Sequence, residues 1–272
     1  MPVEPVARMD GAGLGAPLTE EDTKVGALLT DGQMARSSGK IVLEILIGGQ
    51  SGVGKTTLAK AWSAGKAYDA ATDKTPLMDC FTSELVVPDQ DGGGDVHLEY
   101  RAYDVAGHDR FGKGSAVTAG VVRQSRLFMI VFDVSKPETF TDALEWKQNL
   151  EAKGAMAGVK WMLVMSKIDL IATENLDSNW LTTNYNGVLD PADLGVINQQ
   201  RTQANQIIFN YIDVFSRAAT RHGFNTFFPV SAHSFVGIAQ AFDWAWAKAK
   251  THLQEYDFIF SVLDNINVFL IF

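Results

Sequence analysis

The sequence predicts an α/β protein with a mostly parallel sheet of six strands, helices on both faces and one antiparallel edge hairpin. Two observations lead to this fold class. From residue 41 onward, short apolar runs typical of buried strands alternate with segments typical of helices. A glycine-rich turn follows the first apolar run and polar motifs follow three later ones, as at the ligand-binding edge of an open α/β sheet. With 272 residues and 46% hydrophobic composition, the chain can bury one sizeable core.

The predicted elements follow in chain order. Strands are expected at residues 41–47, 81–87, 96–103, 127–133, 161–165 and 227–230. Helices are expected from residue 57 and at residues 138–152, 199–222 and 234–252. The second and third strands flank the polar, glycine-rich residues 88–95, and this arrangement predicts the edge hairpin.

Composition divides the chain into three segments. Residues 1–39 lack sustained periodicity and predict a flexible N-terminal extension. Residues 40–252 form the folded domain, with an insertion at about residues 175–200 that contains turn residues. The insertion is either a plain surface feature or a partner-docking element, and we favour docking because long ordered loops are commonly functional. Residues 253–272 form an apolar tail, too short and interrupted for a membrane span of about 20 apolar residues.

Charge and cysteine content narrow the class of protein. The net charge of −9 argues against binding to nucleic acid or to an anionic membrane surface. The one cysteine, Cys80, excludes an intramolecular disulfide framework and fits a reducing compartment. We therefore expect a cytoplasmic protein that binds no nucleic acid.

A phosphate-binding loop is predicted between the first strand and the first helix. Residues 49–57, Gly-Gln-Ser-Gly-Val-Gly-Lys-Thr-Thr, fit the P-loop pattern G-x-x-x-x-G-K-[ST] in the strand–loop–helix context that it requires. Backbone N–H groups of such a loop point at phosphate oxygens, beside the positive end of the helix. Lys55 can reach the β- and γ-phosphates, and the Thr56 hydroxyl can hold Mg²⁺. The predicted phosphate-binding residues are Gly49, Ser51, Gly52, Val53, Gly54, Lys55, Thr56 and Thr57.

A second motif, Asp104-Val105-Ala106-Gly107, follows the third strand. Asp104 can hold a Mg²⁺-bound water there, since it faces the P-loop from a strand end. Gly107 lets a backbone N–H approach the γ-phosphate without a Cβ in the way. We expect Gly107 and Lys55 to belong to the catalytic machinery.

Two further motifs predict a preference for guanine. The Asp169 carboxylate, in Ser166-Lys167-Ile168-Asp169, can accept both the N1–H and the exocyclic amine of guanine, whereas adenine offers no such donor pair. The turn Ser231-Ala232-His233 can touch guanine O6 through its backbone. The chain is therefore predicted to bind GTP or GDP with Mg²⁺. The predicted base-side residues are Ser166, Lys167, Asp169, Ser231, Ala232 and His233.

Together these motifs resemble those of the Ras superfamily of small GTPases, nearest the Rab branch. Residues 49–57 are similar to the Rab P-loop, residues 104–111 to the family's D-T-A-G-Q-E-R-F, and residues 132–140 to the Rab segment after the fourth strand. The resemblance covers residues 41–250 with one large insertion. It implies a P-loop NTPase fold of the Ras-like G-domain type and Mg²⁺-dependent hydrolysis of GTP to GDP. It also implies effector proteins, an exchange factor and a GTPase-activating protein as partners.

The resemblance also implies a switch threonine on Mg²⁺ and a residue that orients water. Thr72, Thr75 and Thr82 are candidates for the threonine, and we prefer Thr75, with the alternative that none serves. His108 stands where most relatives carry glutamine. A neutral imidazole can position water and a protonated one can stabilise negative charge, so His108 is a candidate catalytic residue. The alternative is a slow or inactive hydrolase.

Two base-side positions also depart from the family pattern. Ser166 replaces the usual asparagine, which braces the P-loop and touches the base, and the shorter serine is expected to do only part of this. His233 replaces the usual lysine, with little expected effect because the contact there is largely through backbone.

Two hypotheses for function follow. The first is a Rab-like regulatory switch, and the second is a structural or scaffold GTPase-fold subunit of a trafficking or ciliary assembly. The sequence has no C-terminal cysteine, so we expect no prenyl anchor or other lipid anchor. A protein partner for the apolar tail or the inserted region would then place the chain at a membrane or in a complex.

Overall fold

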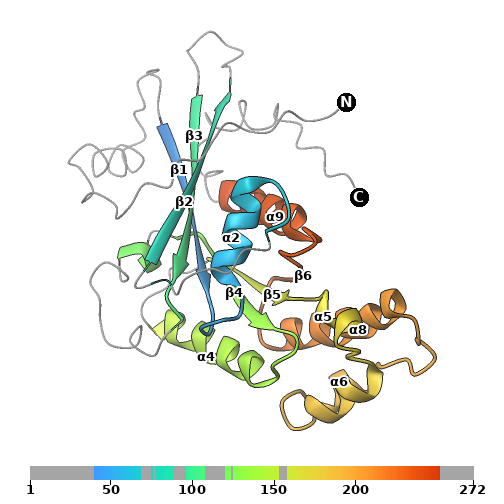
Figure 1. Ribbon diagram of the computed structural model, residues 1–272. Coiled ribbons are helices and arrows are strands. Elements are labelled where there is room, and N and C mark those ends of the chain that lie inside the picture. The colour runs from blue at the N-terminus through green and yellow to red at the C-terminus, as the bar shows by residue number, and fades with distance from the viewer. Residues whose placement is uncertain are drawn as a thin grey trace.

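The computed structural model describes residues 40–68, 75, 78–87, 96–107, 120–123, 125–152 and 158–251 (Figure 1). The predicted N-terminal extension, the loop at 88–95 and the tail at 253–272 lie outside these ranges. Within them, no helix is both long enough and apolar enough to cross a membrane.

Six strands form one sheet in the order β2-β3-β1-β4-β5-β6. Their bounds are β1 (Lys40–Gly48), β2 (Met78–Val87), β3 (Val96–Val105), β4 (Leu127–Asp133), β5 (Lys160–Ser166) and β6 (Thr226–Pro229). Only β2 and β3 pair antiparallel among these strands, and the other neighbours are parallel. The predicted fold class and its antiparallel edge hairpin are therefore confirmed.

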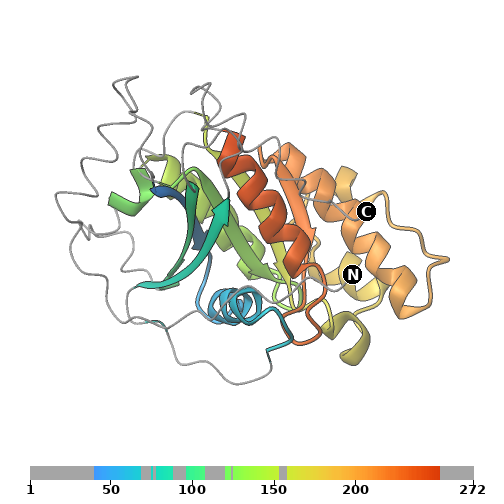
Figure 2. The same ribbon diagram turned by 90° about the horizontal axis from the view of Figure 1, so that it is seen from above.

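Helices cover both faces of the sheet (Figures 1 and 2). The bounds are α2 (Lys55–Ala64), α4 (Glu138–Ala152), α5 (Leu170–Thr173), α6 (Ser178–Asn184), α7 (Pro191–Leu194), α8 (Ala204–Arg221) and α9 (Ile238–Thr251). Alternation along β1 separates the two cores, because successive side chains of a strand point to opposite faces. Ile45 and Ile47 pack with α2 and α9, whereas Leu46 packs with α4 and α8. All of β4 is buried, as expected for a central parallel strand.

The insertion is helical where the sequence suggested only turns. Asp177 and Asp190 start α6 and α7, since their carboxylates accept from the N–H groups of Trp180 and Ala192. The Asp190-Pro191 pair is thus a helix start, with proline at the first helical position. Gly187, with a φ of 79°, does form the predicted turn.

Helix α2 begins at Lys55, two residues before the predicted start, and two other predicted helix starts were wrong by a larger margin. Helix α8 begins at Ala204 rather than at residue 199, because the Asn198 side chain accepts from the Gln200 N–H in a local turn that competes with the helix. Helix α9 begins at Ile238 rather than at residue 234. Before it, the Ser231 N–H donates to the Val236 oxygen, and Phe235 has a φ of 60°, which no helix accommodates.

Candidate functional site

The P-loop leaves β1 and enters α2 directly. The eight predicted phosphate-binding residues lie in this loop and in the first turn of α2. A Cβ on Gly49 would lie 2.3 Å from the Val131 oxygen, so the loop can approach β4 only with glycine there. Gly54 caps α2 without a side chain, which leaves the backbone N–H groups of the first turn facing outward at the positive end of the helix. The loop therefore offers an anion site built from backbone.

The Lys55 side chain is buried against this loop. It is 5% exposed, and its Nζ donates to the Gln50 oxygen at 3.0 Å. Burial lowers the pKa of Lys55 to about 8, and the charge of Asp104 opposes this shift. A phosphate oxygen close to Nζ would favour the protonated form of Lys55, and the resulting ammonium would attract the anion.

Three oxygens from distant parts of the chain converge beside Lys55. The Thr56 Oγ1 lies 2.9 Å from the Thr75 Oγ1, and the Thr75 hydroxyl donates to Asp104 Oδ2 at 3.0 Å. The Thr56 hydroxyl donates to the same carboxylate oxygen at 2.5 Å. The structure thus brings together all three predicted metal ligands. Thr72 lies outside the described residues, and Thr82 lies in β2 opposite Arg101.

The carboxylate of Asp104 fits a bound cation. Its side chain is fully buried, and Oδ1 has no hydrogen-bond partner among the described residues. Burial raises the pKa of Asp104, against the lowering effect of the Thr56 hydrogen bond and the Lys55 charge. A carboxylate and two hydroxyls are hard oxygen donors of the kind that Mg²⁺ prefers, and a cation would satisfy the open oxygen. Thr56, Thr75 and Asp104 could therefore hold Mg²⁺, directly or through water.

Gly107 follows β3 and lies against the P-loop. A Cβ at this position would lie 2.3 Å from the Ser51 nitrogen and 2.5 Å from the Gln50 carbonyl carbon. Only glycine permits this close backbone approach. His108, the next residue and the predicted catalytic side chain, lies outside the described residues.

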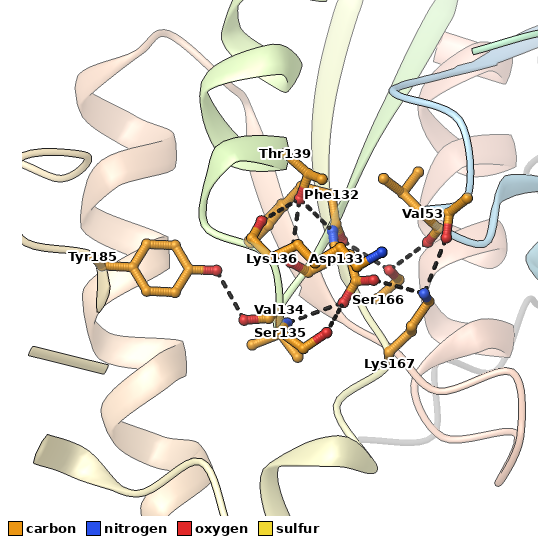
Figure 3. Close-up of polar contacts among 11 residues, drawn as sticks. Val53, Phe132, Asp133, Val134, Ser135, Lys136, Thr139, Ser166, Lys167 and Tyr185 are labelled. Carbon is orange, nitrogen blue, oxygen red and sulfur yellow. Dashed lines mark hydrogen bonds and ion pairs between the residues drawn. The ribbon is translucent and has the colours of Figure 1, made fainter. Parts of the chain in front are cut away.

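The predicted base-side motif is tied to the P-loop (Figure 3). The Lys167 ammonium donates to the Gly52 oxygen at 3.0 Å and pairs with Asp133 Oδ2 at 2.6 Å. The Ser166 Oγ lies 2.6 Å from the Val53 oxygen. The end of β5 and the P-loop therefore form one bonded unit.

Asp169 and Ser231 are held together on this side. The buried Ser231 donates its hydroxyl to Asp169 Oδ1 at 2.6 Å, and its Oγ accepts the Ser234 N–H at 3.1 Å. The Ala232 oxygen accepts from the Tyr68 N–H, and the His233 side chain is exposed. Asp169 is partly exposed, so its carboxylate is fixed in place yet open to a ligand.

Sequence reasoning missed two residues of this arrangement, Asp133 and Tyr185. Asp133 is fully buried at the end of β4 and accepts from the Ser135 N–H and hydroxyl as well as pairing with Lys167. Its place at the end of a fully apolar strand was a usable signal. Tyr185 lies among turn residues, and no periodic pattern of apolar residues around it indicated that it would be buried.

Comparison with known proteins identifies the class. The Ras family model matches residues 44–251, so the chain belongs to the Ras family. The chain is similar to Ras-related protein Rab-12 of Rattus norvegicus, with 28% identity over 60% of this chain and 61% of that protein. It is also similar to Ras-related protein RABC2a of Arabidopsis thaliana, with 30% identity over 50% of this chain and 62% of that protein.

A third relative, Ras-related protein Rab-32B of Dictyostelium discoideum, is 28% identical over 52% of each chain. The matched region spans between about half and six tenths of the length of these three relatives. The predicted resemblance to the Ras superfamily and its Rab branch is therefore confirmed.

Proposed function

We propose that this protein is a Rab-like regulatory GTPase that binds GTP and GDP with Mg²⁺ and hydrolyses GTP to GDP. The observation that carries the proposal is the convergence of Thr56, Thr75 and Asp104 beside the P-loop lysine, with a buried carboxylate oxygen left open. Membership of the Ras family supports it independently.

The proposed roles of the residues follow from their positions. The P-loop N–H groups and Lys55 hold the phosphates, and Thr56, Thr75 and Asp104 hold Mg²⁺, which supplies positive charge for the phosphoryl oxygens. Asp169, oriented by the Ser231 hydroxyl, accepts from guanine N1–H and its amine. Lys167, Ser166 and the 231–233 turn border the base.

For hydrolysis, we propose that the Gly107 N–H binds the γ-phosphate and that His108 orients the attacking water. Gly107 already lies against the P-loop in the structure. A neutral imidazole at residue 108 would accept from water, and a protonated one would stabilise charge on the transferred phosphoryl group.

The switch itself would use the segments around Thr75 and Gly107. Both residues reach the phosphate side of the P-loop from segments that lead into β2 and out of β3. Contacts to the γ-phosphate and Mg²⁺ would order these segments, and hydrolysis would release them. We propose effector proteins, an exchange factor and a GTPase-activating protein as partners, and partner-mediated recruitment to a membrane or a trafficking complex.

The test is nucleotide content and turnover. The full chain is purified, its bound nucleotide is identified by chromatography, and single-turnover GTP hydrolysis is measured with Mg²⁺. Lys55→Ala should lose nucleotide and turnover, whereas Lys66→Ala, an exposed lysine just after α2, should retain both.

Three outcomes separate the hypotheses. Bound guanine nucleotide with turnover that needs Lys55 supports the GTPase. Tightly held GTP without turnover would replace the hydrolase with a nucleotide-bound structural subunit. Absence of guanine nucleotide, before and after its addition, would overturn the proposal.

A further inference from the structure

The insertion between α5 and α8 contacts the turn after β4 through one tyrosine. Tyr185 directly follows α6 and is fully buried. Its ring lies edge-on to Phe215 of α8, with centroids 5.1 Å apart, and its hydroxyl donates to the Val134 oxygen at 3.0 Å (Figure 3). Burial raises the pKa of Tyr185 well above its ordinary value, so the phenol stays protonated and keeps this donor.

Val134 begins the turn between β4 and α4, and this turn is bonded on both sides. The Val134 N–H donates to the backbone oxygen of Ser166 at 3.2 Å. The side chains of Ser166 and Lys167 in turn bond the P-loop. Asp133, the preceding residue, pairs with Lys167, whose ammonium also donates to Gly52 (Figure 3). A continuous path of bonded groups therefore runs from Tyr185 to the P-loop.

The insertion is firmly anchored at its other side. Asn210 of α8 donates to the Ser178 hydroxyl of α6 at 2.7 Å, and both residues are buried. Arg221 of α8 forms two hydrogen bonds to the buried Asp193 of α7, at 3.0 and 2.8 Å. Because both short helices are fastened to α8, Tyr185 presents its hydroxyl from a packed element rather than from a loose loop.

We propose that Tyr185 is a positioning residue that slows release of the bound guanine nucleotide. Its hydrogen bond fixes the Val134 turn, and the turn fixes Asp133, which in turn holds Lys167 against the P-loop and beside the base. This inference rests on the proposed function, because it concerns the nucleotide bound there. It gives the insertion an internal role as a brace of the nucleotide site.

The test compares two tyrosine-to-phenylalanine variants of the full chain. Tyr185→Phe keeps the ring and removes the donor to the Val134 oxygen. Tyr211→Phe is the matched control, since Tyr211 is also fully buried and donates to a backbone oxygen, that of Leu176, at 2.9 Å. Both variants lose one buried hydrogen bond, so thermal denaturation should report similar losses of stability.

Only Tyr185→Phe should change the nucleotide site. Release of a fluorescent GDP analogue from the Mg²⁺-loaded protein should accelerate roughly fivefold, the order expected from one lost buried hydrogen bond. Tyr211→Phe should leave GDP release at the wild-type rate, because the Tyr211 hydroxyl donates to Leu176 and not to the turn after β4. In nucleotide-free protein, amide hydrogen exchange of peptides covering residues 130–137 should also speed up in this variant alone.

The inference and the proposed function fail in different ways. Wild-type release from Tyr185→Phe, or equal acceleration in both variants, would reduce Tyr185 to a general contribution to stability. If the wild type binds no guanine nucleotide, the proposed function and the claim about release both fail, and hydrogen exchange still decides whether Tyr185 holds the turn after β4. Unchanged exchange at residues 130–137 would then show that Tyr185 does not hold the turn.

Discussion

The Ser166 hydroxyl lies 2.6 Å from the backbone oxygen of Val53, which joins the end of β5 to the P-loop across 113 positions of sequence. The Ser166 Oγ also lies 2.8 Å from the backbone oxygen of Phe132 in β4. A hydroxyl has one proton, so the two carbonyls share it. The serine is shorter than the family's asparagine, yet its hydroxyl reaches the P-loop backbone.

We predict that Ser166→Ala accelerates nucleotide release by about tenfold and lowers the free energy of unfolding by about 1 kcal/mol, because two buried carbonyls lose their donor. Ser125→Ala is the matched control. Ser125 is also fully buried, but its hydroxyl has no hydrogen-bond partner among the described residues. Release kinetics of a fluorescent GDP analogue check the prediction, and equal rates for the two variants would contradict it.

The second prediction concerns Mg²⁺. In the wild type, chelation of Mg²⁺ should accelerate GDP release, and Asp104→Asn should release GDP rapidly with or without the ion. The reason is that the open Oδ1 of Asp104 is the carboxylate oxygen available to the cation or its water. Asp79→Asn provides the control, since Asp79 pairs opposite Asp104 on β2 but is exposed. A Mg²⁺ effect that survives in Asp104→Asn would remove Asp104 from the metal site.

The third prediction uses the lowered pKa of Lys55, about 8 against an ordinary 10.5. Between these values the folded, nucleotide-free protein binds fewer protons at Lys55 than the unfolded chain does. The free energy of unfolding of the nucleotide-free protein should therefore rise as the pH rises from 8 to 10.5. Below pH 8 Lys55 is charged in the folded protein, and the full cost of burying that charge is present. Lys55→Met should remove that cost.

Thermal denaturation of nucleotide-free protein at pH 7 and pH 9 tests this sign. We expect Lys55→Met to be more stable than the wild type at pH 7, with a smaller difference at pH 9. Lys66→Met, at an exposed position, should differ little from the wild type at both values. A less stable Lys55→Met at pH 7 would show that the lysine stabilises the empty site. Loss of nucleotide binding should accompany either result.

The sequence allowed the sheet, its edge hairpin and the order of its ligand-binding motifs to be predicted, because each depends on local patterns. Thr75 could be proposed only from its distance along the chain, and the structure places it beside Thr56 and Asp104. The place of Asp133 at the end of the apolar strand β4 was a signal that the sequence did offer. The role of Tyr185 could not be predicted, because it depends on contact with a turn 51 positions away, and no period or motif encodes such a contact.

The last prediction concerns guanine selectivity. The Ser231 hydroxyl occupies Asp169 Oδ1 and fixes the carboxylate, so the partly exposed acid can accept from the two donors on the guanine edge. Asp169→Asn keeps the shape but replaces one acceptor with an N–H donor. Its affinity for GDP should fall by about a hundredfold or more, since a site built to pair polar groups strongly rejects a mismatched edge.

The same variant should bind xanthosine diphosphate better than GDP, because xanthine carries an oxygen where guanine has its amine. Competition against a fluorescent nucleotide measures both affinities. Asp177→Asn is the control: Asp177 caps α6, and its substitution should leave the preference for GDP unchanged. If Asp169→Asn retained the wild-type preference, guanine recognition would have to come from the backbone of the 231–233 turn instead.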